Sequence, residues 1–257
     1  MKIAIIGSGF FGATLGLYLS KKNKVTIYEK EKNILNGASS ANQFRFHLGY
    51  HYPRSKKTIS EINKSKKLFT SFNGFKVFQK TINYYLIAKE SKTNFTKYKL
   101  FLKKNRLYNK SINFLNLSKK IDKVILSNEK ILNYFKYKKS LLKKIQKSKL
   151  KLRLNTEFKK DDLNNYDKVI IATYSNNNLV LKKLGIKKLQ KYKFELVEKI
   201  IIKLPKRFSK KSYVVVDGKF VCVDPYLGTN YHLLSDVKLS KLEIITGNFP
   251  IFKDKKK

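Results

Sequence analysis

The opening thirty residues hold the feature that most restricts what this chain can fold into. An apolar, β-branched segment, KIAII, runs directly into Gly7, Gly9 and Gly12, and is followed by residues with helical apolar spacing. A second strand-like segment, KVTIYE, then ends in Glu29. In such a unit the first glycine permits a tight turn, the second lets the backbone approach a pyrophosphate, and the third lets helix and strand pack closely. The order predicts a Rossmann-like dinucleotide-binding unit whose helix N-terminus offers N–H groups to phosphates.

The acid that closes the second segment narrows the choice of dinucleotide. A carboxylate at Glu29 can accept hydrogen bonds from the adenosine ribose hydroxyls, whereas it would repel a 2′-phosphate. The fingerprint therefore disfavours NADP and leaves FAD and NAD both open. Ser8, Phe10 and Phe11 complete the turn and are candidate cofactor contacts with the three glycines.

A second informative stretch carries two of the three histidines. Arg45, His47, His51 and Arg54 lie within ten residues of one another, although only five of the 58 basic residues are arginine. Gly49 and the following proline oppose a helix, so the pattern favours an extended strand that presents positions 45, 47, 49 and 51 on one face. We expect this face to meet a cofactor or substrate, with room for a flat group at Gly49; purely structural histidines are the alternative. With no cysteine or clustered carboxylate nearby in the sequence, we expect no metal site.

Composition limits the partners and the compartment. The formal net charge is +41, but the basic residues are nearly all lysine, and arginine is preferred for phosphate and base recognition. We therefore expect a solvated lysine surface and no nucleic acid partner. The single cysteine, Cys222, indicates a reducing, cytoplasmic environment, and no segment has the length of a membrane span.

A resemblance to a known family rests on three consecutive segments: IAIIGSGFFGATLGLYLSKKNKVTIYEKE, NGASSANQ and FRFHLGYHYPRSKKT. Together they resemble the FAD-dependent oxidoreductases of the D-amino-acid oxidase family. The resemblance implies FAD as cofactor, with the small-residue turn around its ribityl and pyrophosphate groups. It also implies that Arg45, His47 and His51 lie near flavin and substrate. The FAD contacts that it implies are Ser8, Gly9, Glu29, Lys30, Ser39, Ser40, Asn42 and Gln43.

A further resemblance lies downstream, in LKLRLNTEFKKDD and NNYDKVIIATYSNNN. These segments are similar to the family's return to the nucleotide domain, which implies cofactor contacts at Phe158, Ala172 and Thr173. Tyr174 stands where the family usually has glycine, and tyrosine tolerates a left-handed backbone poorly.

The expected fold is α/β: a Rossmann-like FAD-binding domain with a parallel sheet, interleaved with a mainly antiparallel substrate domain. We assign residues 1–75 and 151–185 to the first domain and residues 76–150 and 186–257 to the second. Within these ranges we expect a helix over 56–72, sheet strands from 74 to about 101, a helix within 133–149 and a hairpin turning at 217–218. The resemblance implies that the C-terminal part of the family fold is missing.

The predicted function is a flavoprotein oxidoreductase that transfers a hydride from a small amine or hydroxy acid to FAD. Arg45 and Arg54 are candidates for binding a substrate carboxylate, and His47 and His51 are candidates for proton transfer. The expected partner is a small-molecule substrate; the sequence leaves its identity, the electron acceptor, the attachment of the flavin and the oligomeric state open. The alternatives are a flavin-dependent mutase similar to UDP-galactopyranose mutase, an NAD-dependent reductase and a non-enzymatic, basic polyanion-binding protein.

Overall fold

The structure, a computed structural model, describes residues 1–114, 117–218 and 220–253 and divides them into two compact units. One unit comprises Met1–Asn42, Lys138–Val197 and the described part of Lys241–Lys257. The other comprises the described residues of Gln43–Tyr137 and Glu198–Ser240. The functional domains expected from the sequence have other boundaries and stay a prediction.

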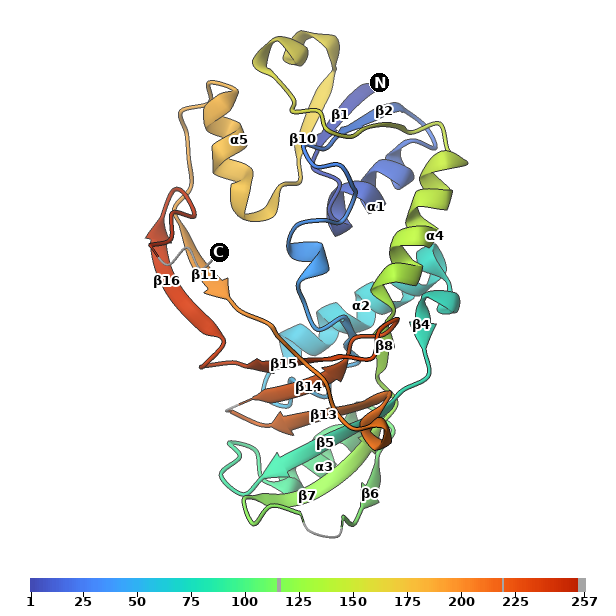
Figure 1. Cartoon of the computed structure of the whole chain (residues 1–257), viewed down its shortest axis with the longest axis vertical. Coiled ribbons are helices and arrows are strands. Elements are labelled where there is room, and N and C mark those ends of the chain that lie inside the picture. The colour runs from blue at the N-terminus through green and yellow to red at the C-terminus, as the bar shows by residue number, and fades with distance from the viewer. Residues whose placement is uncertain (115–116, 219, 254–257) are drawn as a thin grey trace. The chain divides into compact units, whose positions relative to one another are not determined.

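The first unit is built on a parallel four-stranded sheet in the order β10-β1-β2-β9, of which Figure 1 labels β10, β1 and β2. Its strands are β1 (Lys2–Ile6), β2 (Lys24–Tyr28), β9 (Lys151–Arg153) and β10 (Lys168–Ile171), and α1 (Phe10–Leu19) connects β1 to β2. This arrangement confirms the predicted Rossmann-like unit and the return of the chain to it near residue 150. The unit also contains α5 (Asn177–Lys183) and a separate antiparallel pair, β11 (Tyr192–Val197) and β16 (Lys241–Gly247).

Two glycines let α1 lie directly on the sheet. A Cβ atom on Gly12 would stand 2.0 Å from the carbonyl oxygen of Gly7, and one on Gly16 would stand 2.7 Å from Cδ1 of Ile27. Neither position has room for a side chain, so the glycine spacing read from the sequence has its cause in helix–strand packing. Apolar side chains then fill the rest of this interior, with Ala4, Ile6 and Tyr28 among the buried residues.

The second unit is built on a seven-stranded sheet in the order β12-β15-β14-β13-β5-β7-β6 (Figure 1). All its neighbouring strands are antiparallel except β13 and β5, so the expected mainly antiparallel sheet is confirmed. The strands are β5 (Ile82–Ala88), β6 (Lys110–Ile112), β7 (Ile121–Ser127), β12 (Ile200–Ile202), β13 (Lys211–Val216), β14 (Val221–Pro225) and β15 (His232–Asp236). A small sheet is formed by β3 (Arg45–Phe46), β8 (Lys130–Leu132) and β4 (Phe78–Gln79). Strand β3 begins the segment 45–54, which holds His47 and His51 and is called the histidine stretch or histidine loop below.

The helices confirm some sequence-based predictions and correct one. The helix expected over 56–72 is α2 (Lys56–Asn73), and the lysine-rich helix is α4 (Tyr134–Gln146). Strands β13 and β14 pair as the predicted hairpin requires, but their connection includes residue 219, which lies outside the described residues, so the turn at 217–218 stays a prediction. The expectation of strands up to residue 101 is wrong, because α3 occupies Phe95–Lys104. The side chain of Asn94 caps this helix by accepting from the Lys97 N–H, and Tyr98 and Leu102 bury one face at helical spacing.

Among the helices of the described residues, none combines the length and apolar character needed to cross a bilayer.

Candidate functional site

In the first unit, glycines determine the shape of the turn between β1 and α1. Gly7 has φ +100°, and a Cβ atom there would come within 2.7 Å of the Ala172 carbonyl oxygen. Gly9 precedes the first residue of α1, and a Cβ atom there would meet only the Ser39 hydroxyl, at 3.4 Å. The fold thus demands glycine at 7 and 12 but not at 9. The close approach of a pyrophosphate to Gly9 stays a prediction, and the open space at this position is compatible with it.

Glu29 is fixed beside this turn at the carboxyl end of β2. Its Oε2 atom accepts hydrogen bonds from the Ser8 N–H at 2.8 Å and the Ser8 hydroxyl at 2.7 Å, and its Oε1 atom accepts from the Glu31 N–H at 3.0 Å. A carboxylate has about four lone-pair positions, so it can still accept from a ribose hydroxyl. Ser39 joins the same place, because its hydroxyl accepts from the Phe10 N–H at 2.9 Å. The structure therefore brings Ser8, Gly9, Phe10, Glu29 and Ser39 together.

The other predicted cofactor residues are less directly placed at this turn. The ring of Phe11 is exposed, Lys30 lies 3.9 Å from the exposed carboxylate of Glu31, and the Ser40 hydroxyl donates to local carbonyls. Asn42 donates to the Ser39 carbonyl. Gln43 belongs to the second unit, and both polar atoms of its amide are buried without a hydrogen-bond partner. A buried amide normally has partners, so Gln43 is a position that fits a polar ligand.

The downstream contacts lie where the chain returns to the sheet. The Ala172 N–H donates to the Ile6 carbonyl, and Thr173 donates to Asn177 through both its N–H and its hydroxyl. The ring of Phe158 packs edge-on against Tyr28 in the core. Tyr174 has φ +57°, so the chain adopts the left-handed backbone here despite the tyrosine, whose side chain stays exposed. A left-handed non-glycine residue costs roughly 1–2 kcal/mol.

In the second unit, Arg45 lies at the centre of a buried charge cluster. Its guanidinium donates to Glu129 at 2.8 Å, to the Ser212 hydroxyl at 2.6 Å and to Asp224, and both carboxylates are fully buried. The Arg45 guanidinium thus forms ion pairs with two carboxylates, those of Glu129 and Asp224. Burial raises the pKa of Asp224, whereas at Glu129 the effects of His47 and the Arg45 charge outweigh burial and lower the pKa. The surroundings therefore favour the ionised carboxylate more strongly at Glu129 than at Asp224.

Arg54 is also bound to an acid of its own chain. Its guanidinium donates to both oxygens of Asp217, at 2.7 Å from Nε and 3.2 Å from Nη2. Asp217 lies in the connection between β13 and β14 and also accepts from the Thr93 hydroxyl at 2.9 Å. Arg45 is almost fully enclosed, so it could bind a substrate carboxylate only if one of its ion pairs opened. The side chain of Arg54 is half exposed and uses Nε and one Nη toward Asp217, so its ion pair would not have to open.

His51 is held as a neutral imidazole with a defined tautomer. The Tyr85 hydroxyl donates its single proton to Glu129 at 2.5 Å and lies 2.7 Å from Nδ1 of His51, so Nδ1 must carry the proton that Tyr85 accepts. The lone pair of His51 is therefore on Nε2, which lies 3.8 Å from Sγ of Cys222. Burial, followed by the neighbouring His47, lowers the pKa of His51 to about 3.

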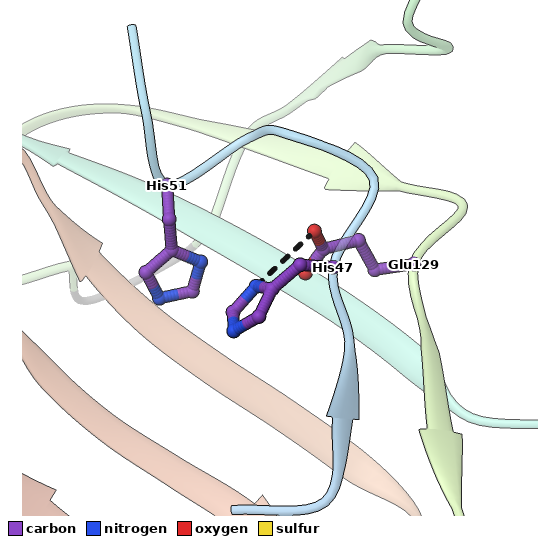
Figure 2. Close-up of side chains that lie close together, drawn as sticks. All are labelled: His47, His51 and Glu129. Carbon is purple, nitrogen blue, oxygen red and sulfur yellow. Dashed lines mark ion pairs between the residues drawn. The ribbon is translucent and has the colours of Figure 1, made fainter. Parts of the chain in front are cut away.

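His47 completes the group around Glu129 (Figure 2). Its Nδ1 atom is buried without a hydrogen-bond partner, 3.7 Å from Oε1 of Glu129, and its ring stands edge-on to His51 with centroids 4.7 Å apart. The ligand atoms of His47, His51 and Glu129 lie within 4.8 Å of one another, a donor set that some metals bind. A metal ion bound here would compete with the Arg45 guanidinium for the Glu129 carboxylate. The sequence-based expectation that the protein has no metal site stays a prediction.

The way in which these residues meet differs from the expected strand. Strand β3 ends at Phe46, and the Tyr52 N–H donates to the Gly49 carbonyl, which closes a turn. Gly49 has φ +120°, and a Cβ atom there would lie 2.6 Å from Cδ1 of Ile59, so the Ile59 side chain of α2 occupies the space on that side of the glycine. The expectation of one extended face through position 51 is therefore wrong, although the side chains that it grouped do converge on Glu129.

Sequence reasoning missed the residues that organise this cluster: Tyr85, Glu129, Ser212, Asp217 and Asp224. A usable signal existed for Glu129 and Asp224, because only 17 acidic residues occur in the chain and these two adjoin apolar strand segments, in SNEKIL and VCVDPY. The third histidine, His232, is 4% exposed and its Nε2 lies 3.1 Å from the Phe208 carbonyl, which favours a structural role.

Comparison with known proteins agrees with the family resemblance described in the sequence. Residues 2–233 match the family model DAO, FAD dependent oxidoreductase. The chain is similar in fold to glycine oxidase from Geobacillus kaustophilus, with 16% identity, a TM-score of 0.68, and coverage of 96% of this chain and 72% of the other. L-alpha-glycerophosphate oxidase from Mycoplasma pneumoniae with FAD bound has 18% identity, a TM-score of 0.66, and the same two coverages.

A curated relative matches a shorter stretch. FAD-dependent monooxygenase kojA from Aspergillus flavus is 39% identical over 59 residues, which is 23% of this chain and only 14% of that protein. The family match covers most of the chain, and the fold and the resemblance stated above agree with it. The chain belongs to the DAO family of FAD-dependent oxidoreductases.

Proposed function

We propose that this chain oxidises a small amine or hydroxy acid by hydride transfer to FAD. The observation that carries the proposal is the buried group around Glu129, which presents a neutral imidazole on the loop that the family resemblance assigns to the flavin side. When bound, FAD supplies the acceptor for the hydride. The residues of the chain then have to position the substrate and accept the proton from its nitrogen or oxygen.

We assign the adenosine and pyrophosphate groups of FAD to the first unit and the substrate to the second. Gly9 and the N-terminus of α1 would hold phosphate oxygens, and Glu29 would accept from the ribose hydroxyls. Gly7, Gly12, Ala172 and Thr173 shape this turn, and Phe10 connects it to Ser39. Lys30, Ser40, Asn42, Gln43 and Phe158 remain proposed contacts on the strength of the resemblance.

In the second unit we assign proton transfer to His51 and His47. The lone pair of His51 is on Nε2, away from Tyr85, so Nε2 is the atom that would accept a proton. Nε2 has the Cys222 thiol as a hydrogen-bond partner at 3.8 Å, and the pKa of about 3 that burial imposes makes this imidazole a weak base. Tyr85 and Glu129 act as positioning residues, because they set the tautomer. Arg45 holds Glu129 in its ionised form, and Arg54 anchors the end of the histidine loop through Asp217. We also place the protein in the cytoplasm, since its single cysteine cannot form an intramolecular disulfide.

The direct test is reduction of the FAD-loaded protein in the absence of oxygen. Mixing with a panel of amino and hydroxy acids should bleach the flavin absorbance with at least one compound, and no nicotinamide should be needed. In His51→Asn, which keeps an N–H donor for Tyr85 but lacks the basic Nε2, bleaching should slow by about 10²-fold or more. A protein that takes up FAD but is bleached by no panel member would contradict the proposed substrate class. One that takes up no FAD would contradict the cofactor assignment.

The second candidate reaction is monooxygenation, which the name of the kojA relative suggests. It predicts oxygen consumption that depends on a reduced nicotinamide and yields a hydroxylated product. Oxidation of substrate without added nicotinamide distinguishes the first candidate from this one.

A further inference from the structure

A cavity in the second unit lies outside the residues used so far. It has a volume of about 460 Å³ and is bounded by α2, by the loop that follows α3, by the histidine loop and by the residue that precedes Glu129. The lining residues are Leu48, Asn63, Lys66, Lys67, Asn105, Arg106, Leu107 and Asn128. The volume falls within the range of sites for small molecules.

The lining is cationic and rich in hydrogen-bond donors. Three of the eight residues are basic, three are carboxamides, and none is acidic. Within the described part of the chain, no carboxylate lies within ion-pairing distance of Lys66, Lys67 or Arg106, whereas the buried Arg45 and the partly exposed Arg54 are both paired. The hollow thus gathers positive charge that the protein does not compensate.

Arg106 distinguishes the lining of this cavity from the rest of the lysine-rich surface. It is one of only five arginines, and its backbone has φ +52°, a conformation that a non-glycine residue adopts at a cost. The turn is held by hydrogen bonds from the Arg106 N–H to the Lys103 carbonyl and from the Leu107 N–H to the Leu102 carbonyl. The guanidinium at this strained position offers the planar donor fork that phosphate recognition favours.

We propose that this cavity binds the phosphate group of a small phosphorylated molecule. Arg106, Lys66 and Lys67 neutralise the phosphate, the carboxamides of Asn63, Asn105 and Asn128 donate to its oxygens or to neighbouring hydroxyls, and Leu48 and Leu107 contact an apolar part. Two walls adjoin the charge cluster in the chain: Leu48 follows His47 and donates its N–H to Glu129, and Asn128 precedes Glu129. A bound ligand therefore touches the segments that position the histidines.

The test measures binding of radiolabelled inorganic pyrophosphate to the FAD-loaded, full-length protein by equilibrium dialysis at physiological salt. Arg106→Gly removes the guanidinium and suits the left-handed backbone, so the fold should be kept; it should weaken binding about tenfold. The double variant K66A/K67A should weaken it by at least as much. The matched control is K57A/K64A, which removes two charges from the same helix at residues that do not line the cavity, and it should change binding less than twofold.

The source of the phosphate is resolved by a second arm with phosphatidylcholine vesicles that contain phosphatidic acid. Cosedimentation that is lost in Arg106→Gly would assign the phosphate to a lipid headgroup, and dialysis binding without cosedimentation would assign it to a soluble molecule. Equal weakening in K66A/K67A and K57A/K64A would show non-specific attraction to a polycation and would overturn the proposal. So would wild-type affinity in Arg106→Gly, and neither result depends on whether the protein oxidises any substrate.

Discussion

At the scale of single residues, the hydroxyl of Tyr85 determines the state of the candidate base. It lies between an ionised carboxylate and an imidazole nitrogen and has only one proton to give, so the carboxylate takes that proton and the imidazole must donate its own. The chemistry available at Nε2 of His51 is thus decided by a residue 34 positions away.

Replacing Tyr85 with phenylalanine should therefore affect both stability and tautomer. The change leaves the buried Nδ1–H of His51 without an acceptor and takes a donor from Glu129, so the free energy of unfolding should fall by about 1–3 kcal/mol. Nitrogen NMR of the histidine rings should show loss of the Nδ1–H form. Tyr84→Phe is the matched control, because the Tyr84 ring stacks on Tyr213. The free energy of unfolding of this variant should differ from that of the wild type by less than about 0.5 kcal/mol. Equal effects of the two variants, with the tautomer retained, would refute the argument.

The depressed pKa of His51 makes stability depend on pH in a defined direction. Between about pH 6.5 and about pH 3 the unfolded chain binds a proton at this residue while the folded protein does not. The free energy of unfolding should therefore decrease as pH falls through this range, with a contribution from His51 of up to about 1.4 kcal/mol per pH unit. Urea unfolding followed by circular dichroism at pH 7, 6 and 5 measures the slope. His51→Asn should have the shallower slope, and parallel curves would show that His51 titrates normally in the folded state.

At the scale of elements, the β1–α1 turn contains one glycine that the packing of the fold requires and one that only the cofactor is predicted to require. Gly12 is required because the helix touches the strand, while the space at Gly9 would admit a methyl group. Both glycines belong to the same short sequence pattern. Packing within the protein requires glycine at position 12, whereas only the predicted cofactor contact would require it at position 9.

This difference predicts opposite behaviour for two alanine substitutions. Gly12→Ala should destabilise the protein by at least about 2 kcal/mol, since its Cβ would overlap backbone that cannot move away. Gly9→Ala should change the unfolding free energy of the FAD-free protein by less than about 1 kcal/mol and should weaken FAD binding at least tenfold, because the methyl group would occupy the path of the pyrophosphate. Thermal melts with and without FAD, combined with flavin titration, measure both quantities. Unchanged FAD affinity in Gly9→Ala would remove the pyrophosphate from this turn.

At the scale of the whole molecule, net charge dominates the electrostatics. The chain carries +41, and the ion pairs of the described residues engage only a small share of its cations. Like charges at such density repel one another and destabilise the compact state.

Salt should therefore stabilise the protein. Raising NaCl from about 0.01 M to about 0.15 M shortens the screening length from about 30 Å to about 8 Å, and Tm should rise by roughly several degrees. Melts of the FAD-saturated protein followed by circular dichroism test this, with an equal osmolarity of sucrose as the uncharged control. A Tm that falls or does not move with salt would mean that the lysines are already compensated.

Local patterns in the sequence were sufficient for the Rossmann unit, α2, α4 and the pairing of β13 with β14. Glycine spacing, apolar periodicity and turn residues act over a few positions and can be recognised without a structure. They failed at α3, where a capping asparagine competed with an alternating pattern, and at Gly49, where a turn replaced an extended strand. The family resemblance supplied FAD itself, which the glycines alone could not separate from NAD.

The turn at Gly7–Gly12 and its acidic partner Glu29 could be recognised from the order of residues alone, because the turn residues are near neighbours and their backbone geometry is local. The partners of the arginines and histidines between Arg45 and Arg54 follow only from the three-dimensional fold. Arg45 meets Glu129 and Asp224 across 84 and 179 positions, and Arg54 meets Asp217 across 163. Buried charges require partners wherever the fold can bring them. Which acid reaches which arginine is a property of strand order and register, and these arise only when the whole sheet has formed.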